Sequence, residues 1–172
     1  MRVALTGTPG TGKTTAAKEL PYEVIHLNEV IREEELWTER DEGRDSLVVD
    51  VEALADWVDA AVGDAPVVVL ESHLAHLLPA DRVVVLRCRP DVLERRLRDR
   101  GESPDKAAEN AESEALDVVL TEAVEDHGAD AVYEIETTDA PADVVAAEIE
   151  AAVEGRRDPS AGTVDFTSYL QP

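Results

Sequence analysis

Eight residues near the start of the chain have the types and spacing of a phosphate-binding loop. They read Gly7-Thr8-Pro9-Gly10-Thr11-Gly12-Lys13-Thr14 and match the Walker A pattern G-x-x-x-x-G-K-[ST]. Glycines let the backbone curl until successive N–H groups point at one anion, and a helix that starts at the loop adds the positive end of its dipole. Lys13 supplies a mobile charge for β- and γ-phosphates, and the Thr14 hydroxyl suits Mg²⁺. The pattern predicts binding of a nucleoside triphosphate with its magnesium ion.

The surroundings of this pattern make it more specific than the pattern alone. It follows an apolar run at residues 3–6 and precedes helix-forming residues, and Lys13 is one of only three lysines, with Lys18 and Lys106. The alternative is a glycine-rich turn that caps a helix. A GTPase is a minor possibility, because neither Asn28 nor Asn110 is followed by lysine, as the guanine motif N-K-x-D requires.

A second feature is a concentration of arginine between residues 87 and 100. This stretch has six arginines against three acidic residues in a chain whose formal charge is −23. Phosphoryl transfer needs guanidinium groups that neutralise the charged equatorial oxygens. Arg96 and Arg100 are four residues apart and share one helix face, which makes both of them candidates for this role. The alternative is a helix C-terminus decorated with favourable cations.

Three further residues are candidates for the acceptor and metal sites. Arg32 would hold the phosphate of an acceptor, or equally would pair with its glutamate neighbours. Glu71 ends a buried strand beside the loop and is expected to hold the water shell of Mg²⁺; a polar strand end facing solvent is the alternative. His73 would orient water or contact phosphate, or else cap a helix. The remaining histidines and the single cysteine do not have the spacing of a zinc site.

Apolar runs and helical periodicity predict the elements that must position these residues. Strands are expected at residues 3–6, 23–27, 67–70, 83–86 and 132–135. Helices are expected at residues 13–20, 28–36, 50–62, 90–100, from about 104 through 124, and around 144–153, with a mobile loop at 37–46. The alternation predicts a three-layer α/β fold, a P-loop NTPase with a five-stranded parallel sheet between helices. Trp37 and Trp57 are interpreted as packing residues.

The charge balance indicates the setting in which the protein works. The chain of 172 residues has 39 acidic and 16 basic residues. Such a surface repels itself in dilute buffer, but at molar salt the Debye length falls to about 3 Å. This favours a salt-rich cytoplasm of a halophilic source over an ordinary acidic protein, and it disfavours sequence-independent binding of nucleic acid. One cysteine, no secretory signal and no long apolar run are consistent with a cytoplasmic location and no membrane span.

Residues 2 to about 150 resemble the adenylate kinase isoenzyme 6 family, small archaeal and eukaryotic P-loop kinases connected with ribosome assembly. The segments that support this resemblance are residues 6–15, Ile31-Arg-Glu-Glu34, residues 40–45, Glu71-Ser-His73, Leu86-Arg87, residues 95–101 and Glu109-Asn110. One departure concerns Glu71, where the family often has aspartate. Glutamate keeps the charge but lengthens the side chain by one methylene.

The resemblance implies a broad-specificity nucleoside monophosphate kinase, with AMP as the favoured acceptor and ATP and Mg²⁺ as cofactors, that also hydrolyses ATP slowly. ATP would bind Gly10, Thr11, Gly12, Lys13, Thr14, Thr15 and Arg100. Thr14 would be a direct metal ligand and Glu71 a ligand through water. Residues 26–49 would bind the acceptor, and residues 99–109 would form a short lid.

The same resemblance implies a partner, a platform ribosomal protein of the small subunit, with rRNA involved only indirectly in late maturation. The rival hypothesis is an ATP-switched assembly factor whose kinase activity is incidental; a third is another small-molecule kinase. We expect a monomer with one domain, residues 1–154, and a C-terminal tail, residues 155–172, which Phe166 and Tyr169 would anchor.

Overall fold

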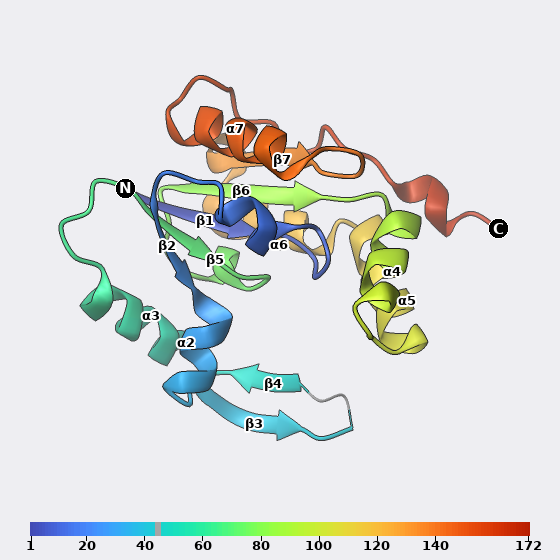
Figure 1. Cartoon of the computed structure of the whole chain (residues 1–172), viewed down its shortest axis with the longest axis horizontal. Helices are drawn as coiled ribbons and strands as arrows, with labels where there is room; N and C mark the ends of the chain where they lie inside the picture. Colours follow the sequence, from blue (N-terminus) through green and yellow to red (C-terminus); the bar gives the residue numbers. More distant parts are fainter. Residues whose placement is uncertain (44–45) are drawn as a thin grey trace.

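A parallel sheet of five strands forms the centre of the molecule in a computed structural model that describes residues 1–43 and 46–172. The strand order is β2-β5-β1-β6-β7 (Figure 1). The strands are β1 (Arg2–Thr6), β2 (Glu23–His26), β5 (Val68–Glu71), β6 (Arg82–Arg87) and β7 (Val132–Glu136). The predicted five-stranded parallel sheet is confirmed.

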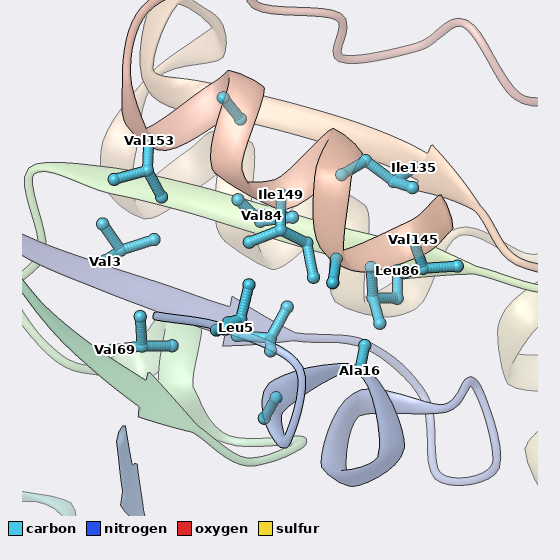
Figure 2. Close-up of a cluster of buried hydrophobic side chains, with 14 of the residues drawn as sticks. Val3, Leu5, Ala16, Val69, Val84, Leu86, Ile135, Val145, Ile149 and Val153 are labelled. Atoms are coloured by element: carbon cyan, nitrogen blue, oxygen red, sulfur yellow. The ribbon is translucent and has the colours of Figure 1, made fainter. Parts of the chain in front are cut away.

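Apolar side chains on both faces of the central strands explain why helices cover both sides. Along β1, Val3 and Leu5 enter one buried cluster and Ala4 enters the other, because successive side chains of a strand point to opposite faces. Figure 2 shows the first cluster, in which Val145 and Ile149 lie over the sheet. Helices α1 (Lys13–Ala17) and α7 (Ala142–Val153) cover this face.

The second face is covered by three helices and a short 3₁₀ turn. They are α2 (Leu27–Glu33), α3 (Val51–Ala61), the short 3₁₀ turn η1 (Ala75–Leu77) and α6 (Val118–His127). Leu27, Leu54, Leu78 and Leu120 are buried against β-strand valines such as Val83. Helices on both faces complete the predicted three-layer arrangement.

Helices α4 (Pro90–Asp99) and α5 (Pro104–Ala115) form a pair beyond the carboxyl ends of β1 and β6 (Figure 1). Ser103 starts α5 as an N-cap, since its hydroxyl accepts from the amide of Lys106. Between the pair lies a small cluster of Cys88, Leu93, Leu97 and Ala107. Burial raises the pKa of the Cys88 thiol to about 11, so this cysteine is a packing residue.

The predicted mobile loop at 37–46 is wrong over its described part. An antiparallel hairpin of β3 (Trp37–Asp41) and β4 (Ser46–Val49) occupies this region, and Arg44 and Asp45 lie outside the described residues. Trp37 and Val49 pack against the core, whereas most of the hairpin's charged side chains are exposed, so one apolar face suffices to dock it. The preceding helix also ends early, at Glu33, and Glu35 adopts a left-handed φ of 55°.

The single helix predicted from about 104 through 124 is also wrong. The structure divides it into α5 and α6 at Asp117, whose φ is 56°. The Asp117 carboxylate pairs with Arg87 from β6 at 2.5 Å. This long-range contact stabilises a backbone conformation that helical periodicity does not reveal.

The residues after α7 return along the molecule and end beside α4 and α5 (Figure 1). Phe166 is buried, and a 3₁₀ turn, η3 (Thr167–Leu170), follows it; a further turn, η2 (Ala129–Ala131), precedes β7. The expected anchoring by Phe166 is confirmed, and the Tyr169 hydroxyl reaches Glu94 at 3.2 Å. Among the described residues, no helix is long and apolar enough to cross a membrane.

Candidate nucleotide-binding site

The loop between β1 and α1 has a backbone that requires glycine at two crowded points. Gly7 has a φ of 145°, and a Cβ there would lie 2.6 Å from the carbonyl oxygen of Leu86. Gly10 has a φ of 91°, and its Cβ would come within 3.0 Å of Leu97. Side chains are therefore excluded where the loop passes β6 and α4, as expected for a backbone that curls around a phosphate.

Lys13 is folded back across this loop. Its side chain is buried, and Nζ donates to the carbonyl oxygens of Gly7 at 2.8 Å and Thr8 at 3.1 Å. Burial lowers the pKa of Lys13 to about 8, although Glu71 and Glu114 oppose the shift. The ammonium group is therefore charged at neutral pH and close to losing its proton in mild alkali.

We expect ATP affinity to fall as the pH rises through about 8. Below that value Lys13 carries the charge that attracts phosphate; above it the group becomes neutral, so the dissociation constant should rise by up to about tenfold per pH unit. Fluorescence titration between pH 6.5 and 9.5 measures this dependence. Lys13→Arg keeps its charge throughout and should bind with little pH dependence, whereas a flat wild-type curve would contradict the assignment.

Glu71 ends β5 next to the loop and meets two side chains. Its Oε1 accepts from the Thr14 hydroxyl at 3.4 Å, and its Oε2 lies 2.7 Å from Nδ1 of His26. A hydroxyl and a carboxylate at the rim of a phosphate loop fit Mg²⁺, which takes few protein ligands and completes its shell with water and phosphate. Among the described residues, no group of three or more His, Cys, Asp or Glu side chains could hold a metal ion.

His26 is a residue that the sequence analysis missed. It ends β2, and the parallel register places it directly beside Glu71 of β5. The signal was available only through the strand order, because 45 residues separate the two side chains in sequence. The imidazole fixes the orientation of the Glu71 carboxylate.

His73 lines two adjoining pockets, one of which contains Arg32 and the other Thr8 and Pro9 of the loop. Burial, with Lys13 and His76 nearby, lowers the pKa of His73 to about 4. The imidazole is therefore neutral at physiological pH. It can accept or donate one hydrogen bond, but it adds no positive charge to the site.

A pocket of about 490 Å³ lies on the α2 side of the site. Its lining includes Trp37 and Arg40 of the hairpin, Arg32 of α2, and His73 and Lys106. Arg32 is exposed, and in the described part of the chain no ion pair or hydrogen bond holds its guanidinium, so the expected alternative of pairing with glutamate neighbours is not found there.

A second pocket, of about 390 Å³, lies on the α4 and α7 side of the loop. Its lining includes Gly10, Thr11, Gly12, Thr15, Arg96, Arg100 and Thr137. Arg96 donates to the carbonyl oxygens of Thr137 and Thr138 at 3.1 and 3.0 Å and approaches that of Gly10 at 3.4 Å. It connects the loop to the segment after β7, and Arg100 remains exposed at the rim.

Of the other four arginines of the cluster, Arg95 is exposed and three pair with carboxylates. Arg87 is buried in an ion-pair network, Arg89 pairs with Asp91, and Arg98 approaches Glu94 at 3.8 Å. In the part of the chain that the structure describes, Arg96 and Arg100 are the two of these six arginines that line the pocket at the phosphate loop. These are the two that helical spacing had singled out.

Comparison with known proteins places this geometry in a family. A family model described as an AAA domain matches residues 3–117. Proteins named "Putative adenylate kinase" are similar along nearly the whole chain: 62% identity in Natronomonas pharaonis, covering 99% of this chain and 100% of the relative, and 39% in Methanocaldococcus jannaschii, covering 97% and 93%. The chain belongs to the family of these adenylate kinase relatives. A relative from Halobacterium salinarum is 57% identical, covering 99% of this chain and 100% of its own.

A solved structure has a fold similar to that of this chain. A shikimate kinase from Bacteroides thetaiotaomicron superposes with a TM-score of 0.60 at 22% identity, covering 90% of this chain and 98% of its own. The P-loop kinase fold is therefore confirmed. The relatives' names specify adenylate kinase but no isoenzyme, so the narrower isoenzyme 6 assignment stays a prediction.

Proposed function

We propose that the protein is a nucleoside monophosphate kinase of the adenylate kinase type, which converts ATP and AMP to two ADP. The observation that supports this function best is a pair of pockets. One is lined by the phosphate loop, and the other adjoins, at His73 and Lys106, a third pocket that Thr8 and Pro9 of the loop line. One pocket is lined by the loop with Arg96 and Arg100, and the other contains Arg32 and His73. Two nucleotides entering from opposite sides would bring their phosphates together at Lys13.

In this proposal the chain positions charges rather than moving protons. Loop amides and Lys13 bind the β- and γ-phosphates of ATP, and Arg32 binds the acceptor phosphate. An acceptor oxygen forms a bond to the γ-phosphorus while the bond from that phosphorus to the β–γ bridging oxygen breaks. No general base is required, because the attacking oxygen is already ionised. Thr14 directly, and Glu71 through water, would hold Mg²⁺, which would supply positive charge to the phosphate groups.

The lid that we propose, residues 99–109, is short, which leads us to expect slow hydrolysis of ATP as a second activity. Only four residues connect α4 to α5, so little chain is free to close over the phosphates. Arg100 and then Arg96 would offset the developing charge, while water would be excluded incompletely. We therefore include slow hydrolysis of ATP in the proposal.

A coupled assay of ADP formation tests the function directly. It should be run in molar salt, which screens the charge of −23, with ATP alone and then with a panel of monophosphates. We expect slow ADP release without acceptor and a large stimulation by AMP. Rates that no monophosphate changes would refute the kinase, and stimulation by shikimate alone would assign another acceptor.

Replacing Arg32 with glutamine should weaken acceptor binding selectively. Loss of a charge-assisted hydrogen bond to phosphate should raise the KM for AMP by about 10- to 100-fold and leave that for ATP within about twofold. Arg95→Gln is the matched control, since Arg95 is an exposed arginine of α4. Equal effects of Arg32→Gln on both substrates would remove Arg32 from the acceptor site.

Two further properties stay predictions of the family resemblance: a role in late small-subunit maturation and a platform ribosomal protein as partner. A cytoplasmic location and a halophilic source stay predictions from the composition and charge. The acidic surface is the feature that would suit a basic partner. Affinity capture in molar salt, with and without ATP, tests the partner. Capture that depends on ATP but not on AMP would favour the assembly hypothesis.

A further inference from the structure

A buried ion-pair network lies behind the phosphate loop, and its centre is Arg87. This arginine ends β6 and is 1% exposed. Its guanidinium contacts Glu114 of α5 at 2.8 Å, Glu134 of β7 at 2.6 Å and Asp117 at 2.5 Å. Burial opposes the charge of Arg87, but Glu114 and Asp117 outweigh it and raise its pKa. One cation thus joins three parts of the chain that are distant in sequence.

On one side the network holds the phosphate loop. The Thr8 hydroxyl donates to Oε2 of Glu114 at 2.6 Å, and the other oxygen of Glu114 accepts from Arg87 and from the amide of Cys88. The carbonyl of the same Thr8 receives Lys13 Nζ. Thr8 therefore connects Glu114 to the ammonium group that would bind phosphate.

On the other side the network is completed by residues that follow α7. Oε2 of Glu134 accepts from the amide of Thr163 at 2.7 Å, from its hydroxyl at 3.2 Å and from the amide of Val164 at 3.3 Å. The ring of Phe166, itself 8% exposed, lies 5.4 Å from the Arg87 guanidinium. The C-terminal segment thus supplies both donors and apolar cover.

Charge balance makes these two sides interdependent. Arg87 faces three carboxylates, so the buried carboxylates need further donors. If the C-terminal segment separates, Glu134 loses three donors and Arg87 loses its cover. The guanidinium is then drawn toward Glu134 and water, and its hold on Glu114, which holds Thr8, weakens.

We propose that the segment after α7 positions the phosphate loop through Glu134, Arg87 and Glu114, so that its docking and the binding of nucleoside triphosphate favour each other. Glu114 and Arg87 are positioning residues that act through Thr8. The inference rests on the proposed nucleotide site and is independent of which acceptor the protein uses.

Hydrogen exchange on the unmodified chain tests the coupling. Because linkage is reciprocal, saturating MgATP should slow exchange at the amides of Thr163 and Val164 by about five- to tenfold. The Lys13→Met chain, which should bind ATP poorly, should show no slowing at the same ATP concentration. Unchanged exchange in the wild type with ATP bound would overturn the proposal.

A tail variant provides the complementary measurement. Phe166→Ala should raise the dissociation constant for MgATP by about five- to tenfold, while Phe166→Leu, which keeps apolar cover, should recover most of the affinity. Tyr169→Phe is the matched control, because it removes only the hydroxyl that reaches Glu94. Thermal unfolding is recorded for each variant, and titrations are made well below its midpoint.

The outcomes separate positioning from mere support of the fold. A lower melting temperature for Phe166→Ala with wild-type ATP affinity would overturn the proposal. A wild-type protein that binds ATP but phosphorylates no monophosphate would refute the proposed function alone, because both tests measure binding and not turnover.

Discussion

Replacing Lys13 with methionine is expected to lower ATP turnover by about a thousandfold, with and without AMP. Methionine has nearly the same length and suits a buried position, so the backbone should persist while the charge disappears. The ammonium now donates to two loop carbonyls from a site that is 8% exposed. In the proposed reaction it would follow the γ-phosphoryl group, where low dielectric strengthens its effect.

Lys18→Met is the control for this substitution, since Lys18 is an exposed lysine at the end of the same helix. It should keep wild-type rates within about twofold because exposed charges contribute little. Turnover is measured by ADP release, and thermal unfolding verifies that both chains are folded. Lys13→Met activity within tenfold of the wild type would show that the loop is not the catalytic phosphate site.

Gly7→Ala is expected to destabilise the fold by about 3 kcal/mol, through a strained φ together with overpacking. A Cβ at Gly7 would lie 2.6 Å from the Leu86 carbonyl oxygen and 2.8 Å from the Thr11 hydroxyl. The first neighbour is backbone of the central strand β6 and has little room to move. The melting temperature should fall by about 6–12 °C for a domain of this size.

Gly63→Ala isolates the effect of adding a methyl group. A Cβ at Gly63 meets nothing within 4 Å, and its φ lies outside the left-handed region. The melting temperature of this variant should stay the same or rise slightly, because alanine reduces the entropy of the unfolded chain. A Gly7→Ala protein as stable as Gly63→Ala would mean that the loop backbone is not constrained as described.

Features encoded by neighbouring residues were predictable from the sequence. The apolar runs specify strands buried on both faces, and the glycines with Lys13 and Thr14 specify the loop. Helical spacing predicted that Arg96 and Arg100 share one face, and both line the same pocket. In each case the physical cause lies within one element or at its junction with the next.

Features caused by long-range contacts were not predictable in the same way. The charged strands β3 and β4 lack strand alternation and are stabilised by packing of Trp37 and Leu47 on the core. The break before α6 depends on Arg87, which arrives from β6. His26 joins Glu71 only because β2 and β5 are neighbours in the sheet. Strand order and side-chain packing, not local pattern, determine these features.

The burial of Cys88 has a practical consequence for following motion in this protein. The thiolate is the form of cysteine that attacks thiol-reactive reagents, and a fully buried thiol with a pKa of about 11 offers almost no thiolate at neutral pH. Cysteines introduced by Val48→Cys on the hairpin and Val144→Cys on α7, both about half exposed, would therefore take a fluorophore pair without removal of the native cysteine. Energy transfer between them would report changes in distance between the hairpin and α7 as each nucleotide binds.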